Sequence, residues 1–128
     1  MSQHIDCVVI GAGASGMMCA GTAAENGNRV VVVEKNKMAG RKLLITGKGR
    51  CNVTNNCDAE TFFANIVSNP RFMMSSFSAF SNEDTIRFFE TLGVPLKTER
   101  GNRVFPSSDK ASDICNALKK YCDDCGVK

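Results

Sequence analysis

The sequence predicts an α/β fold with a parallel sheet, because two strand-like segments flank a helical segment near the N-terminus. Residues 7–10 form a short apolar run, and residues 30–33 are four consecutive valines. Between them, residues 17–27 are rich in Ala and Gly and contain no proline, which indicates a helix that ends at Gly27. A strand, a helix and a second strand in this order are typical of a βαβ unit.

The first turn of this unit contains three regularly spaced glycines. Gly11, Gly13 and Gly16 form the pattern G-x-G-x-x-G directly after the first strand. The first glycine permits a tight turn, the second lets a pyrophosphate approach the backbone, and the third lets the helix pack close to the sheet. Ala14 and Ser15 lie within this turn and are expected to contact the cofactor, since the free amides of the helix N-terminus can bind a phosphate. The pattern predicts a Rossmann-like dinucleotide site.

An acidic residue follows at the end of the second strand. Glu34 lies at about the twenty-residue offset where a carboxylate accepts hydrogen bonds from ribose hydroxyls. A carboxylate there would repel a 2′-phosphate, so we expect a dinucleotide other than NADP. The alternative is a Rossmann-like unit that binds nothing, but three glycines in one turn favour a ligand.

The next segment concentrates the positive charge of the chain. The formal net charge is +3, whereas Arg41, Lys42, Lys48 and Arg50 alone contribute about +4 to residues 40–55, which contain no acid. The stretch "KNKMAGRKLLITGKGRCNVTNN" is polar and glycine-rich, and we expect an irregular segment ordered around a ligand. Its cations suit a pyrophosphate, and its later part suits the far end of an extended dinucleotide such as FAD.

One long motif resembles a known family. "GRKLLITGKGRCNVTN", after "VVVEKNKMAG" and before "RVFPSSDKAS", closely resembles the BaiN/YhiN-type FAD-dependent oxidoreductases, which include aminoacetone-oxidase-like proteins and bile-acid 4,6-dienone reductases. The resemblance covers essentially the whole chain. It implies redox chemistry by FAD, with NAD(P)H or a small organic substrate as electron donor. The implied FAD contacts are Gly11 to Gly16, Glu34, Lys35, Arg41, Lys42 and, toward the isoalloxazine, Gly47, Gly49, Arg50, Cys51 and Asn52.

The resemblance also implies that residues 1–128 are one FAD-binding domain from the N-terminal part of a longer protein. Members of the family continue into a further strand, a substrate domain and a C-terminal segment that contacts the flavin. The further strand is expected just where "CGVK" ends this sequence. An alternative is therefore a non-catalytic fragment that binds only the adenosine half of FAD.

The seven cysteines predict reduced thiols and a cytoplasmic protein, because their number is odd and their spacing irregular. Cys51 and Cys57 resemble the C-x4-C pair of disulfide-reductase flavoproteins, although the interval is one residue too long. A redox pair at these positions stays open as an alternative function. Cys122 and Cys125 are interpreted as packing residues of an amphipathic helix, and we expect no metal site.

The rest of the sequence predicts helices and one hairpin. We expect helices after Asn56, with Pro70 at one helix start and a capping box in "SNED" at 81–84. Residues 95–106 predict a hairpin with Gly101 and Asn102 as a two-residue turn. A final helix is expected within residues 107–126, with apolar residues along one face.

The remaining side chains suggest no protein acid or base for catalysis, and the only histidine, His4, precedes the first strand. We expect a small-molecule substrate and neither a nucleic-acid nor a membrane partner. RNA binding through the basic stretch is a weaker alternative, because no aromatic residues alternate with its cations. Core packing is favoured over a substrate channel for the phenylalanines, which are Phe62, Phe63, Phe72, Phe77, Phe80, Phe88 and Phe89.

Overall fold

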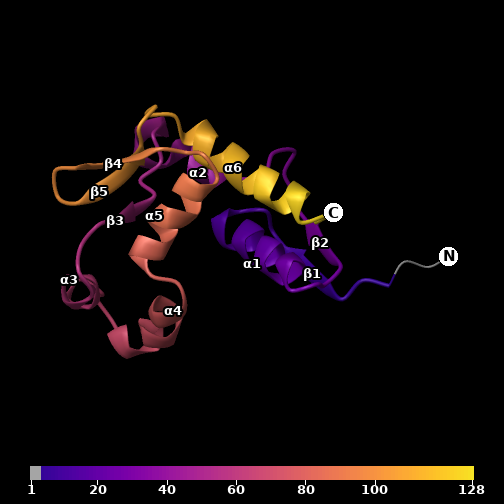
Figure 1. The fold of residues 1–128 in the computed structure, drawn as a ribbon, viewed down its shortest axis with the longest axis horizontal. Coiled ribbons are helices and arrows are strands. Elements are labelled where there is room, and N and C mark those ends of the chain that lie inside the picture. The colour runs from indigo at the N-terminus through magenta and orange to yellow at the C-terminus, as the bar shows by residue number, and fades with distance from the viewer. Residues whose placement is uncertain (1–3) are drawn as a thin grey trace.

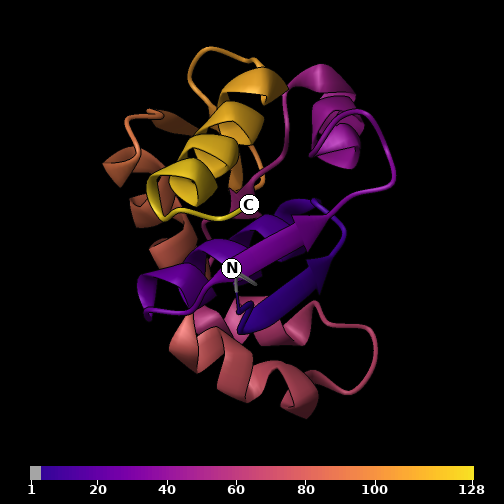
Figure 2. The same ribbon diagram turned by 90° about the vertical axis from the view of Figure 1, so that its right-hand side faces the viewer.

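The computed structural model describes residues 4–128 and confirms the predicted α/β fold. Strand β1 (Cys7–Ile10), helix α1 (Ala14–Glu25) and strand β2 (Val30–Val33) form the βαβ unit, with β1 and β2 parallel and Cys7 opposite Val30. Figure 2 shows the two strands side by side on one side of the molecule. Gly27 has a φ of +85° after the end of α1, as the sequence predicts.

The chain leaves β2 through a segment that is more regular than predicted. It contains the short helix α2 (Arg41–Ile45) and a 3-10 helix, η1 (Thr46–Gly49). The expectation of an irregular segment was therefore wrong for this part. Leu43 and Leu44 pack against the buried core, and this tertiary contact stabilises a helix too short to persist alone. A short strand, β3 (Thr54–Asn55), follows and was not predicted.

The helices that follow form a lobe apart from the parallel sheet (Figure 1). The lobe contains α3 (Ala59–Ala64), the 3-10 helix η2 (Pro70–Met73) and α4 (Met74–Ala79). Helix α5 (Asn82–Thr91) leads back to the core, where Phe89 is buried. Pro70 occupies the first position of η2, which confirms the predicted helix start.

The predicted capping box is present at the start of α5. The Ser81 hydroxyl accepts a hydrogen bond from the Asp84 amide at 3.1 Å, and the Asp84 carboxylate accepts one from the Ser81 amide at 2.8 Å. The backbone and side chain of Ser81 lower the pKa of Asp84 to about 2. We expect Ser81→Ala to reduce the free energy of unfolding by about 1 kcal/mol. Urea titration of this variant beside Ser78→Ala, at an exposed α4 position, tests the prediction, and equal losses would contradict it.

Strands β4 (Leu96–Glu99) and β5 (Arg103–Pro106) form the predicted hairpin, and β3 pairs with β5 in a sheet of order β3-β5-β4. The two-residue turn was wrong, because Glu99 pairs with Arg103 and three residues connect them. Gly101 and Asn102 have positive φ values, and their carbonyls accept hydrogen bonds from Asn55 and Asn56 at 2.9 Å and 2.7 Å. These contacts from β3 shape the loop and have no local sequence signal.

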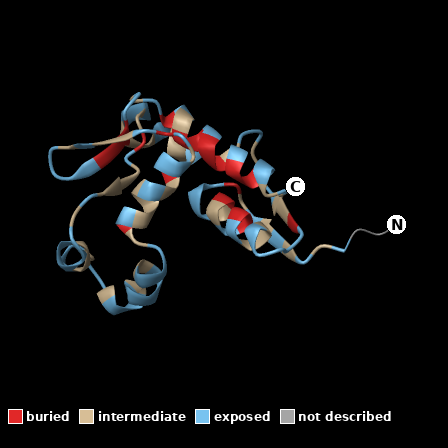
Figure 3. Ribbon diagram, in the orientation of Figure 1, coloured by how far each residue is buried: buried red, intermediate tan, exposed pale blue. Residues whose placement is uncertain are grey.

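The last helix, α6 (Ala111–Asp124), supplies much of the core and packs against α1 and α2. Figure 3 shows its buried face in red, and the buried positions match the predicted apolar face: Ala111, Ile114, Cys115, Leu118 and Cys122, with Cys125 half-buried beyond its end. The close contact with α1 requires Gly21, since an added Cβ would lie 2.1 Å from the Tyr121 ring.

The end of the chain continues the parallel sheet. The Lys128 amide donates a hydrogen bond to the Val30 carbonyl at 3.0 Å, and the Val32 amide donates one to the Lys128 carbonyl at 2.6 Å. This is the pattern of a parallel pairing on the edge of β2 that does not face β1. It lies where the sequence predicts the beginning of a further strand.

The phenylalanines divide into three groups. Phe89 is buried as predicted, and the rings of Phe62, Phe63 and Phe77 stack within the lobe with centroids 4.4 to 5.4 Å apart. Phe72 is 78% exposed, so the expectation of core packing was wrong there, and Phe80 is also exposed. Across residues 4–128, no helix has the length and apolar character needed to cross a membrane.

Candidate functional site

The glycine turn after β1 has the geometry that a phosphate ligand requires. Gly11 adopts a φ of +98°, and its amide donates to the Val33 carbonyl at 2.8 Å. A Cβ on Gly16 would lie 1.9 Å from the Gly11 carbonyl oxygen, whereas a Cβ on Gly13 would meet no atom within 4 Å. Gly16 therefore serves internal packing, and Gly13 borders open space at the start of α1, where no side chain caps the helix.

Glu34 ties the glycine turn to the end of β2. Its carboxylate accepts hydrogen bonds from the Ala12 amide at 2.7 Å and from the Asn36 amide at 2.8 Å. The Ala12 carbonyl accepts a further bond from the Gly40 amide at 2.7 Å. The glycine turn, the end of β2 at Glu34 and the start of α2 at Gly40 thus meet at Ala12. The Asn36 side-chain amide donates a third bond to the Glu34 carboxylate at 2.7 Å. A carboxylate has about four acceptor positions, so about one is left for a ribose hydroxyl.

These hydrogen bonds predict a pH-dependent contribution to stability. The amides of Asn36 and Ala12 lower the pKa of Glu34 below its ordinary value of 4.5. A lowered folded pKa means that the contribution is complete above about pH 4.5 and is lost as the pH falls through the folded value. We therefore expect the difference in melting temperature between wild type and Glu34→Gln to be greatest at neutral pH and to shrink in acid.

Thermal unfolding from neutral pH to about pH 3 measures this difference. Glu90→Gln, at an exposed position of α5, is the matched control and should follow the wild type at every pH. A Glu34→Gln difference that stays constant over the whole range would contradict the prediction.

A groove of about 390 Å³ opens beside Gly13. The structure brings Gly13 and Glu34 together there with the predicted cations Arg41 and Lys42, which begin α2. Lys35 is exposed and does not line the groove. The complete lining is Ala12, Gly13, Glu34, Asn36, Met38, Gly40, Arg41, Lys42 and Ile45.

A second cavity, of about 210 Å³ and mostly apolar, is lined in part by the first residues of α1. Gly13 lines the groove and Ala14 lines this pocket, while Lys42 lines the groove and Leu43 the pocket. Residues that follow one another at the starts of α1 and α2 thus line two different cavities. The pocket is lined by Ala14, Ser15, Met18, Leu43, Cys51, Asn52, Val53, Phe80, Thr85, Phe88, Phe89, Ile114 and Leu118.

Of the predicted flavin contacts in residues 47–52, only Cys51 and Asn52 line the pocket. Gly47 and Gly49 have φ values of +56° and +84° and shape the loop instead. A Cβ on Gly47 would lie 2.9 Å from the Asn52 nitrogen and 3.1 Å from the Phe105 ring. Gly47 thus allows the loop to pass close to Phe105 of β5.

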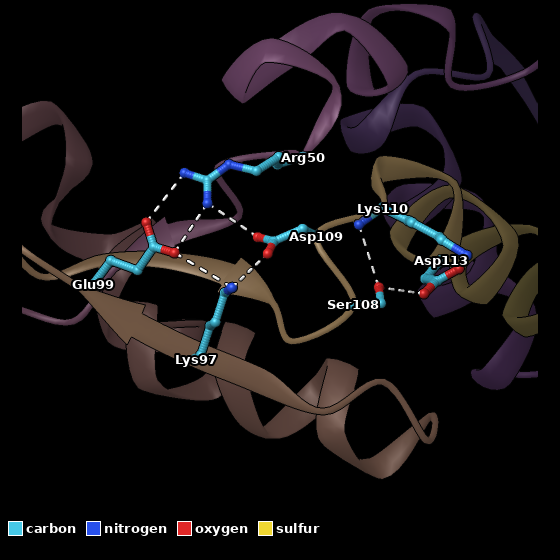
Figure 4. A network of polar contacts seen from close by, with 7 residues as sticks. All are labelled: Arg50, Lys97, Glu99, Ser108, Asp109, Lys110 and Asp113. Carbon is cyan, nitrogen blue, oxygen red and sulfur yellow. Dashed lines mark hydrogen bonds and ion pairs between the residues drawn. The ribbon is translucent and has the colours of Figure 1, made fainter.

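Arg50 lines neither of these two cavities and instead belongs to a network of ion pairs (Figure 4). Its guanidinium donates to both carboxylate oxygens of Glu99 at 2.9 Å and 3.1 Å and to Asp109 at 3.0 Å. These bonds raise the pKa of Arg50, Glu99 being the main cause. Neither partner is predictable from the sequence, because Glu99 and Asp109 lie 49 and 59 residues further along the chain and no local pattern links them to Arg50.

Cys51 and Cys57 are both free thiols in the structure. Cys51 is only 1% exposed, and burial raises its pKa. Because the thiolate is the reactive form, a buried thiol with a raised pKa is a poor partner for disulfide exchange. The geometry argues against the alternative of a redox-active pair and makes Cys51 a lining residue of the pocket.

Comparison with known proteins decides the family. The model of the HI0933-like protein Rossmann domain matches residues 5–128. The chain belongs to this family. A Haemophilus influenzae ribosomal RNA dihydrouridine synthase is 36% identical over all of the chain and 31% of its own length. A Clostridium scindens 3-dehydro-bile acid delta(4,6)-reductase is 35% identical over 87% of the chain and 27% of its own length.

The family includes oxidoreductases, and its Rossmann domain binds FAD. The chain spans about a third of the length of these relatives and is therefore only part of such an enzyme. Among solved structures, Thermovibrio ammonificans THI4 has a TM-score of 0.63 at 14% identity, over 97% of this chain and 37% of that one. This likeness supports the fold.

Proposed function

We propose that this HI0933-like domain binds FAD in an extended conformation, with one half of the cofactor in each of the two cavities. The adenosine and pyrophosphate would occupy the polar groove, and the isoalloxazine would enter the apolar pocket. The observation that supports this most strongly is the position of Gly13, which lines the groove, immediately precedes the pocket residue Ala14 and leaves open space for a phosphate beside the start of α1.

The residues of the groove match the chemistry of the adenosine half. Amides in the first turn of α1 donate to phosphate oxygens, and Arg41 and Lys42 balance their negative charge. Glu34 accepts hydrogen bonds from the ribose. In the pocket, Phe88 and Leu118 supply apolar surface to a flat ring, while Asn52 offers a polar contact at its edge.

Bound FAD supplies two-electron transfer, and the chain supplies binding and orientation. The names of both relatives describe hydrogenation of carbon–carbon double bonds, in a uridine of ribosomal RNA and in a bile acid. We extend this reaction class to the protein that contains this domain, with NAD(P)H as electron donor. A small unsaturated molecule is the first substrate candidate. A uridine in RNA is the second, favoured by the relative at 36% identity.

The role of Glu34 gives a direct test of the groove. We expect ADP to bind at least about ten-fold more tightly than ADP with a 2′-phosphate, because the carboxylate repels the added charge. In Glu34→Gln this preference should largely disappear, while Glu90→Gln should keep it. Isothermal titration of both nucleotides measures the ratio. Equal affinities in the wild type would contradict the assignment of the ribose site.

A further inference from the structure

We propose that Arg50 is a positioning residue for the flavin half of the site. Its ion pairs with Glu99 and Asp109 hold residues 46–52 against the β4–β5 hairpin, so that Cys51 and Asn52 form one wall of the apolar pocket. The proposal rests on the proposed function, because it concerns how the pocket is shaped for FAD.

The contacts of Arg50 are made with the hairpin and the loop that follows it (Figure 4), and Arg50 does not line the pocket. Glu99, in β4, accepts from the guanidinium in a bidentate arrangement, which fixes orientation as well as distance. Asp109 lies after β5 and accepts from Arg50 at 3.0 Å and from Lys97 at 2.6 Å. Lys97 also lies 3.4 Å from Glu99, so two cations and two carboxylates form a closed network.

Phe105 of β5 provides the surface on which the loop rests. The Arg50 guanidinium carbon lies 4.0 Å from the centre of the Phe105 ring. Gly47 lies close to the same ring, because a Cβ added at Gly47 would be 3.1 Å from it. The Val53 amide donates to the Val104 carbonyl at 2.8 Å, which continues the attachment beyond the loop. The loop thus contacts β5 through Gly47 near its start and through Val53 just after its end, and Arg50 attaches it between these two points.

The backbone of the loop needs such support. Lys48 and Cys51 have φ values of +58° and +61°, which non-glycine residues rarely adopt, and Asp109 has a φ of +58° on the other side of the ion pair. Strained backbone of this kind persists where surrounding contacts hold it. Arg50 immediately precedes Cys51, so fixing its side chain helps to hold the turn that directs Cys51 toward the pocket.

Arg50 differs from the cations of the groove in that acidic side chains neutralise its charge. Glu99 and Asp109 neutralise Arg50 and Lys97, so the network offers little attraction to a phosphate. Arg41 and Lys42, in contrast, line the groove and form no ion pair within residues 4–128. Direct binding of FAD is therefore assigned to the groove cations, and loop geometry to Arg50.

A double-mutant cycle separates positioning from direct contact. Arg50→Gln and Glu99→Gln should each lower the affinity for FAD about five-fold and leave the affinity for ADP unchanged, because ADP lacks the flavin half. The double variant should be no worse than either single variant, since both remove the same contact. Asp109→Asn should have the same pattern with a smaller effect. Fluorescence titration with FAD and calorimetric titration with ADP measure the affinities, beside thermal unfolding of every variant.

Arg103→Gln is the matched control, because Arg103 is an exposed arginine of β5 near Phe105 but outside the network. It should bind both nucleotides like the wild type. A loss of FAD affinity in Arg50→Gln without one in Glu99→Gln and Asp109→Asn would show that Arg50 contacts the ligand, and would overturn the proposal. Unchanged FAD affinity in all variants, or equal wild-type affinities for FAD and ADP, would also overturn it. A folded wild type that binds neither nucleotide would overturn the proposed function itself.

Discussion

Gly13→Ala is expected to lower the affinity for both FAD and ADP at least about ten-fold without reducing the stability of the protein. Gly13 has a φ of −83° and a ψ of −172°, which alanine adopts without strain. Its added methyl group would meet no protein atom within 4 Å. The methyl would instead fill the space in which the proposed pyrophosphate approaches the backbone.

Titration with FAD and ADP, together with urea unfolding of the same preparation, measures both halves of this prediction. Gly93→Ala is not a suitable control, because Gly93 has a positive φ that alanine tolerates poorly. Ser78→Ala changes an exposed residue of α4 outside both cavities and serves better. If Gly13→Ala bound nucleotides like the wild type, the pyrophosphate could not lie where we place it.

Gly16→Ala, in contrast to Gly13→Ala, is expected to reduce stability and to lower the free energy of unfolding by about 3 kcal/mol. An alanine Cβ would lie 1.9 Å from the Gly11 carbonyl oxygen, so α1 or the glycine turn must move. The obstructing atom belongs to the backbone, and β1 and β2 fix it through the bond from the Gly11 amide to Val33. No side-chain rotation relieves this contact.

Urea unfolding of Gly16→Ala and Gly13→Ala side by side provides the matched comparison, because both variants add one methyl group to the same motif. Gly16→Ala should be less stable than the wild type, and Gly13→Ala should be as stable as the wild type. Similar stabilities would contradict the structural assignment of Gly16 as the packing glycine and Gly13 as the ligand-facing one.

The βαβ unit was predictable because its signals are local. Gly11, Gly13 and Gly16 follow a strand directly, and Glu34 follows the next one, so their spacing alone places them at one edge of the sheet. The capping box at Ser81 was predictable for the same reason. In both cases the interacting residues lie close together in the sequence or in a recurrent supersecondary unit.

The second half of the site depended on contacts between distant segments. The sequence shows that Arg50 lies in a basic glycine-rich stretch, but only the fold shows that Glu99 and Asp109 neutralise it. Phe80 follows a helical spacing that predicts core packing, yet it is exposed beside the apolar pocket. Helical periodicity identifies an apolar face and does not distinguish a partner helix from a cavity.

The domain also exposes apolar side chains on the parallel sheet, where Val8 and Ile10 alternate with the half-buried Cys7 and Val9. This alternation shows that α1 covers one face of β1 and that the other face is open in residues 4–128.

The measurement that tests the central claim most directly is a titration of the purified, folded chain with FAD, followed by its visible absorption spectrum and a competition with ADP. We predict saturable binding of FAD, flavin absorption bands that remain with the protein after gel filtration, and displacement by excess ADP through the shared groove. A chain that is folded by circular dichroism but binds neither FAD nor ADP would contradict the assignment of a dinucleotide site.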